Sequence, residues 1–206
     1  MLKSTPKSRF EFTGGHLALD FANTVNSRPT DHAEELLADY ASLASWGREA
    51  GVLPPYAYEK LYVQAMQTPA RAAQALQEAI KLRDAIFTVF SAAVEHHAMP
   101  SNALALINFY VQDSAGHRRI TQTGRKFEWE WQHLDAYLTA MLWPVARAAG
   151  DLLVSKQLDQ VRLCASETCD WLFLDTSRNR MRRWCEMKTC GNRDKARRHY
   201  ERSKSE

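Results

Sequence analysis

The sequence predicts a mainly α fold in two parts: a multihelical N-terminal domain with a small β-hairpin, and a small C-terminal module with a treble-clef-like arrangement. Three observations lead to this prediction. Apolar residues recur at helical spacing through most of residues 17–155. Residues on either side of Gly124 alternate in the manner of two paired strands. All four cysteines lie beyond residue 160, where the chain has little apolar surface to bury. We therefore expect domains at residues 1–157 and 158–206.

The N-terminal domain begins with a short alternating segment, Phe10 to Phe12, and a turn at Gly14-Gly15. Helices follow wherever apolar side chains keep a period of 3.6 residues, and Gly and Pro separate them. The expected helices cover residues 17–25, 33–50, 57–66, 69–95, 100–111 and 134–155. Pro144 predicts a kink in the last of them, because its ring removes a backbone hydrogen bond. Strands at residues 117–121 and 126–131 form the expected hairpin.

The C-terminal module is expected to contain a short hairpin followed by a helix. Val161–Leu163 leads into the first cysteine, and Trp171–Leu174 returns as a second strand. Another extended piece, residues 182–185, precedes the second cysteine pair. Asn192 is a good N-cap for a helix over residues 194–202. Trp171, Phe173 and Trp184 are the expected core residues. A knuckle, a hairpin and a helix that starts at the last ligand make the arrangement treble-clef-like.

The cysteines form two C-x4-C pairs separated by fifteen residues: Cys164, Cys169, Cys185 and Cys190. Four thiolates in two close pairs suit the tetrahedral coordination of Zn²⁺. The alternatives are a disulfide framework, a redox dithiol, an Fe–S cluster and four unrelated buried thiols. The C-x-x-C spacing typical of redox dithiols and ferredoxins is missing. We therefore expect one structural zinc ion per chain, with no open coordination position for catalysis.

The first residues lack the apolar segment and cleavage site of a secretory signal, which favours a cytoplasmic protein with reduced thiols. No run of eighteen apolar residues is present, so no contact with a membrane is expected. The sequence also lacks the common nucleophile, P-loop and metalloprotease motifs. We predict no catalytic residues and no enzymatic activity.

Positive charge is concentrated at the C-terminus. Residues 178–206 contain 11 Lys or Arg against 4 Asp or Glu, a net charge of +7, whereas residues 1–177 have a net charge of −4. A basic patch on an acidic body is typical of binding to a nucleic-acid backbone. The predicted contacts are Arg178, Arg180, Arg193, Lys195, Arg197, Arg198 and Arg202. Two alternatives stay open: Arg182 and Arg183 could neutralise the thiolate cluster, and the tail could be a solvated end. DNA and RNA are not distinguished.

Asp20 and Asn23 lie on one face of the first expected helix, and Arg28 follows. These three residues could line a ligand pocket for a small-molecule effector. Alternatively, the polar groups of Asp20 and Asn23 hydrogen-bond to nearby backbone and fix the start of the fold.

Two sequence stretches resemble known families. The segment W-L-F-L-D-T-S-R-N-R-x-R-R-W-C after the first cysteine pair, with C-G-N-R-x-K-A-R-R-H-Y at the second, resembles the CGNR zinc finger. The stretch G-G-H-L-A-L-D-F-A-N-T-V from Gly14 to Val25 resembles the opening of the ABATE domain that precedes this finger in bacterial proteins, and it includes Asp20, Asn23 and Thr24.

The resemblance implies a stress-related transcription regulator that binds DNA through its zinc finger. The helical body would sense an effector or form oligomers such as a homodimer. Two other functions are kept as alternatives. The zinc module could mediate protein interaction or dimerisation without nucleic acid, or the body could serve mainly to bind a small molecule.

Overall fold

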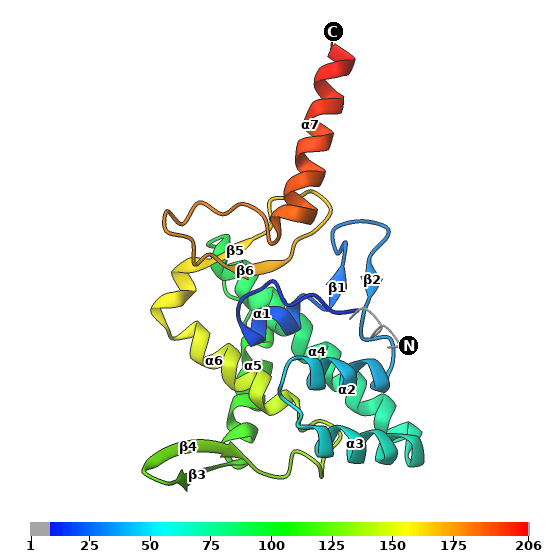
Figure 1. The fold of residues 1–206 in the computed structure, drawn as a ribbon, viewed down its shortest axis with the longest axis vertical. Helices are drawn as coiled ribbons and strands as arrows, with labels where there is room; N and C mark the ends of the chain where they lie inside the picture. Colours follow the sequence, from blue (N-terminus) through cyan, green and yellow to red (C-terminus); the bar gives the residue numbers. More distant parts are fainter. Residues whose placement is uncertain (1–8, 206) are drawn as a thin grey trace, which may run out of the picture.

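The computed structural model describes residues 9–205, which form a mainly helical body with a small module and a protruding helix at one end (Figure 1). The strands pair only in three two-stranded antiparallel sheets within these residues. The helices are α1 (Leu17–Ala22), α2 (Tyr40–Glu49), α3 (Pro55–Gln67), α4 (Pro69–Val94), α5 (Ser101–Ala115), α6 (Leu142–Leu153) and α7 (Asn192–Ser205). The paired strands are β1 (Val25–Asn26) with β2 (Glu34–Glu35), β3 (Arg118–Thr123) with β4 (Lys126–Trp131), and β5 (Val161–Leu163) with β6 (Leu172–Leu174).

The core of the body surrounds α4, the longest helix. Its apolar stripe includes Leu82, Ile86 and Phe90, all fully buried. The short helix α1 packs against α4 and α6 and contributes Phe21, whose ring centre lies 4.7 Å from that of Trp46 on α2. Because α1 is enclosed in this way, the start of the domain is fixed within the core. No helix in the described chain is both long and apolar enough to span a bilayer.

Several predicted elements differ at their ends. The helix expected over residues 33–50 begins only at Tyr40, because the Asp39 carboxylate caps it by accepting from the Ser42 N–H. The helix expected over residues 134–155 begins at Leu142. Pro144 therefore lies in its first turn, where the missing N–H has no partner to lose, and the predicted kink is wrong. The strand expected at Phe10 to Phe12 is also wrong, since these residues are irregular.

An ion-pair network fastens the β1–β2 ribbon to α4. The guanidinium of Arg83 is almost fully buried and lies 2.6 Å from the Glu35 carboxylate and 3.0 Å from that of Asp84. Arg28, from the loop between the two strands, donates to the Ala22 carbonyl and stacks 4.0 Å above the Phe87 ring. The ribbon beside the C-terminal module therefore has a fixed position.

Strand β6 has one face in each of two cores. Leu172 and Leu174 are part of the core of the body, as is Val161 on β5. Phe173, between the two leucines, points into a separate cluster with Trp171 and the four cysteines. Alternate residues of a strand face opposite sides, so three consecutive residues bind the module to the body.

Candidate metal centre

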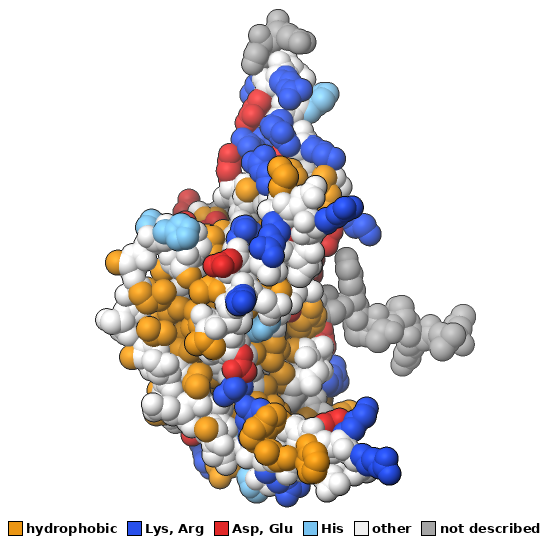
Figure 2. All heavy atoms as spheres, turned by 90° about the vertical axis from the view of Figure 1, so that its left-hand side faces the viewer, with side chains coloured by type: hydrophobic (Ala, Val, Ile, Leu, Met, Phe, Trp, Pro, Cys, Tyr) orange, Lys and Arg blue, Asp and Glu red, His pale blue; other side chains and the backbone are white. Residues whose placement is uncertain are grey.

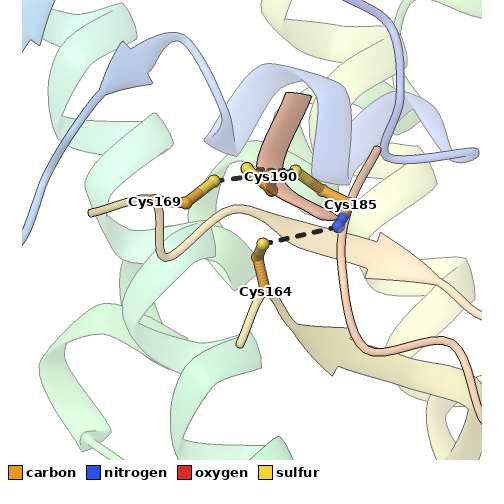
Figure 3. A group of neighbouring side chains, drawn as sticks. All are labelled: Cys164, Cys169, Cys185 and Cys190. Carbon is orange, nitrogen blue, oxygen red and sulfur yellow. Dashed lines mark hydrogen bonds between the residues drawn. The ribbon is translucent and has the colours of Figure 1, made fainter. Parts of the chain in front are cut away.

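The four cysteine sulfurs converge on one point (Figure 3), all within 4.8 Å of one another and all buried. Cys169 and Cys185 have their Sγ atoms 3.6 Å apart, and Cys185 and Cys190 have theirs 3.7 Å apart. Disulfide bonds are about 2.05 Å long, so these thiols are not bonded to each other. A tetrahedron with Zn–S bonds of about 2.3 Å has edges of about 3.8 Å. The spacing and donor set fit one structural zinc ion, which the four thiolates hold.

Backbone hydrogen bonds position the first two ligands. Cys164 follows β5, and its N–H donates to the Trp171 carbonyl at 2.8 Å, which extends the β5–β6 pairing to the ligand. Cys169 closes a turn by donating its N–H to the Ser166 carbonyl. The polar segment between these two cysteines therefore forms the expected knuckle.

The second pair is held by a tight turn. Cys190 lies in the helical turn Met187–Gly191, which the Glu186 side chain caps by accepting from the Lys188 N–H. This turn continues directly into α7. The backbone N–H of Cys185 donates to the sulfur of Cys164 at 3.4 Å. The last ligand and the start of the C-terminal helix therefore share one rigid piece of backbone.

The electrostatics of the cluster favour a cation. Hydrogen bonds from Cys169 and Cys185 lower the pKa of Cys164 to about 7, whereas those with Cys164 raise the pKa of Cys185. Four like charges at this separation repel one another, and a divalent ion offsets that repulsion. With four sulfur ligands the ion has no position for water, so its role is structural.

Arginines surround the cluster in ways that the sequence only partly indicated. The guanidinium of Arg182 donates to the carbonyl oxygens of Trp184 and Cys185 and stacks on the Phe173 ring. Arg183 stacks on Trp184. Hydrogen bonds with the other three thiols lower the pKa of Cys190, and the nearby charge of Arg193 adds to this effect. Charge compensation therefore involves a residue on α7.

The side chain of Asn23 joins the C-terminal module to the body by hydrogen bonds. Its amide donates to the Leu172 carbonyl at 2.8 Å and accepts from the Leu172 N–H at 2.9 Å, in a buried position. The indole N–H of Trp171 donates to the Val25 carbonyl, and the Leu174 N–H donates to the Gly14 carbonyl. These bonds favour the structural interpretation of Asn23 over the ligand-pocket interpretation.

Asp20 and Arg28 also make structural contacts. One Asp20 oxygen accepts from the Gly14 N–H at 2.8 Å, and burial raises the pKa of this carboxyl to about 6. A side chain on Gly14 would collide with Asp20, which explains a glycine there. Arg28 belongs to the ribbon network described above. The structure gives each of the three suggested pocket residues its own backbone partner.

The predicted nucleic-acid contacts fall into two groups. Arg193, Lys195, Arg197, Arg198 and Arg202 lie on α7, where every side chain from Asn192 to Lys204 is exposed except the partly buried Asp194. Arg178 and Arg180 lie on the exposed loop Thr176–Met181 of the same module. Both groups belong to the end of the molecule that carries the cysteines (Figure 1).

From the sequence, Asp175 is expected only to start a turn that continues to Ser177. It is fully buried, and it accepts hydrogen bonds from the Ser177 N–H, the Ser177 hydroxyl and the Arg182 N–H. These bonds lower the pKa of its carboxyl although burial opposes them. Asp175 thereby closes the loop that presents Arg178 and Arg180. The Asp-x-Ser spacing is typical of such a turn, but it does not indicate the bond from the Arg182 N–H.

Two family models match the chain. Residues 15–156 match the ABATE family model, described as "Putative stress-induced transcription regulator". Residues 160–203 match the CGNR zinc finger model. Neither description is that of an enzyme. No curated protein matches the chain.

Proposed function

The chain belongs to the ABATE family and ends in a CGNR zinc finger, and from this we propose that it is a cytoplasmic transcription regulator that binds DNA through the finger and α7. The observation that carries the proposal is the helix α7 itself. It projects from the module (Figure 1), and basic side chains crowd this end of the molecule (Figure 2).

An exposed helix such as α7 needs an anchor to be stable. A fourteen-residue helix that is charged all round buries almost no apolar surface, and isolated helices of this length are marginal in water. Zinc coordination through Cys190 and the adjoining turn fixes its first residues. A metal-anchored basic helix with exposed side chains is suited to contact the phosphates of a DNA groove.

The basic residues of α7 differ in how freely they can reach DNA. The Arg197 guanidinium pairs with the carboxylates of Glu167 and Asp194, and Arg198 pairs with Asp194. Lys195 and Arg202 make no ion pair with any described residue. Arg193 also has no ion pair, but it donates to the Thr168 hydroxyl at 2.6 Å. Of the predicted contacts on α7, we therefore expect Lys195 and Arg202 to contribute most to phosphate binding.

The loop Thr176–Met181 offers a second contact. Its backbone is fixed at both ends by Asp175, and Arg180 adopts a left-handed conformation with φ of 49°. Such backbone in a non-glycine residue costs about 1–3 kcal/mol and is often retained for function. We propose that Arg178 and Arg180 contact the DNA backbone beside the segment that α7 occupies.

The junction between the body and the finger is where a ligand of the body could alter DNA binding by the finger. A crevice of about 240 Å³ lies between the β1–β2 ribbon and the finger, with Asn26 and Glu34 on one side and Arg193 on the other. Its inner wall includes the zinc ligands Cys169, Cys185 and Cys190, so the metal would occupy part of it. A small-molecule effector held there would contact both parts. We propose this crevice, rather than a pocket at Asp20, as the place where an effector acts.

The test is DNA affinity across a range of salt concentrations, measured by fluorescence anisotropy on the zinc-loaded chain. Binding should weaken steeply with salt, by roughly one power of salt concentration per phosphate neutralised. The double variant Lys195→Ala/Arg202→Ala should reduce that slope by about two and weaken binding to all sequences alike.

The matched control is Arg147→Ala, which removes an exposed cation from α6 on the body. It should leave the affinity unchanged. Binding that ignores salt, or an equal loss in the control, would reject DNA recognition by α7. A chain with no affinity for any nucleic acid would favour the protein-interaction module instead.

A further inference from the structure

The hairpin β3–β4 extends from the body and exposes its large apolar side chains. Ile120, Phe127 and Trp129 are 62%, 70% and 61% exposed. Trp131, at the base of the hairpin, is the residue that packs against the body core. In Figure 2 some hydrophobic side chains, among Lys and Arg side chains, lie near the end of the molecule where Figure 1 places this hairpin. A two-stranded hairpin is barely stable in water, so an apolar face on one calls for a covering partner.

The register puts these side chains on one face. Ile120 pairs with Trp129, and Gln122 pairs with Phe127, so all four point to the same side. The opposite face carries the ion pair between Arg119 and Glu130, whose side chains lie 2.7 Å apart. The hairpin is therefore amphipathic, although its apolar side faces solvent.

We propose that this apolar face is a homodimer interface, in which the hairpins of two copies of the chain pack face to face about a two-fold axis. A two-fold interface uses the same patch on both copies, and an apolar sheet face is complementary to itself. Arg118, the one cation on the apolar face, is already stacked 4.2 Å above the Trp129 ring. The other charged residues of the two strands occupy the reverse side, so the contact would bury one charge per chain.

The area available fits a dimer. Large apolar side chains bury about 150–250 Å² each, so the exposed parts of these three offer roughly 400 Å² per chain. Two copies would bury roughly 800 Å² of apolar surface. Homodimer interfaces are about 65% apolar, which implies a total of roughly 1,200 Å², at the lower limit of stable interfaces. A nucleic acid is a poorer occupant, because the face carries a single cation, Arg118, whose guanidinium lies against the Trp129 ring.

The interface would leave the finger free. The hairpin and α7 lie at opposite ends of the molecule (Figure 1), so self-association and DNA binding are separate properties. The inference therefore goes beyond the proposed function, and either could fail alone.

The experiment is sedimentation velocity on the full zinc-loaded chain over a hundredfold range of concentration. The wild type should form dimers, and Trp129→Glu should raise the dimer dissociation constant roughly 100-fold or more, since both copies lose an apolar contact and gain a buried charge. The control, Thr123→Glu, puts the same charge on the polar face opposite Lys126 and should leave the dimer intact.

Circular dichroism and zinc content should match the wild type in both variants, because residues 123 and 129 are exposed. Hydrogen exchange gives a second measurement: amides of β3 and β4 should be protected more at high than at low protein concentration. A wild type that stays monomeric overturns the proposal. Protection of the hairpin amides by single-stranded DNA or by lipid vesicles would then identify a different occupant of this face. A dimer that survives Trp129→Glu overturns it as well.

Discussion

At the scale of single residues, Asp20 shows how a polar group can be part of the fold and still reduce its stability. Burial raises the pKa of its carboxyl to about 6, and the hydrogen bond from Gly14 only partly offsets this. The folded-state pKa is above the unfolded one. The folded protein therefore binds the proton more tightly, and ionisation costs stability as pH rises from about 4 to about 6.

We predict that Asp20→Asn stabilises the protein near neutral pH by roughly 1–3 kcal/mol, since the amide oxygen can still accept from Gly14. The gain should shrink toward zero as pH falls to about 4, where the wild-type carboxyl is protonated in both states. The gain is measured by denaturant unfolding of both proteins at each pH, as the difference between their free energies of unfolding. Acid removes zinc from both proteins alike, so this effect cancels in the difference. A gain in stability that did not depend on pH would refute the raised pKa of Asp20.

The residue pattern indicated that Asp20 and Asn23 matter, but it did not reveal their partners. Asn23 bonds to Leu172, which is 149 positions away in the sequence. Nothing in local spacing encodes a contact at that separation. The zinc ligands could be predicted, because residue type and paired spacing are enough to indicate a four-sulfur metal site. That prediction requires no knowledge of the rest of the fold.

At the scale of elements, long periodic segments were predictable and short capped ones were not. α3 (Pro55–Gln67) and α4 (Pro69–Val94) lie within two residues of the predicted helices at both ends, because apolar periodicity and proline mark them clearly. β1 and β2 are two residues each and exist through tertiary contacts. The start of α2 depends on the capping hydrogen bond of Asp39. Apolar periodicity gives no sign of such a bond.

Strand β6 allows a test of its two faces with neighbouring residues. Leu172 and Phe173 are both fully buried, one against the body and the other against the zinc cluster. We predict that Phe173→Ala speeds the transfer of zinc to a competing chelator, because it removes the packing behind the ligands. Leu172→Ala should instead lower the free energy of unfolding by about 2–5 kcal/mol, with a smaller effect on zinc transfer.

Stopped-flow transfer of zinc to a coloured chelator and denaturant unfolding separate the two outcomes. Equal effects of the two variants on both measurements would mean that β6 does not divide its faces between the cores.

At the scale of the whole molecule, the finger and the body are joined by shared packing as well as by the chain. Val161, Leu172 and Leu174 complete the core of the body, while the residues between and around them form the metal cluster. Asn23 and the Trp171 indole add hydrogen bonds across the junction. The sequence predicted two domains, with a boundary between residues 157 and 158. The packing couples their stabilities, which composition and spacing could not show.

This coupling predicts that zinc stabilises the body as well as the finger. Structural zinc contributes about 10–16 kcal/mol to the folding of isolated zinc-finger peptides, and without it the finger should unfold. The body would then lose β5 and β6 from its core. We expect a chelator to lower the melting temperature of the helical body by roughly 10 °C or more, since 1 kcal/mol shifts a chain of this size by about 2–4 °C.

Differential scanning calorimetry with and without chelator tests this, and hydrogen exchange at α4 and α5 shows whether the body itself is affected. The zinc-loaded chain should melt in a single transition, and returning zinc after chelation should restore it. Two separate transitions, with the upper one unchanged by the chelator, would mean that the body is complete without the finger. In that case a signal received by the body could not reach α7 through β6, because the strand would carry no stability from one part to the other.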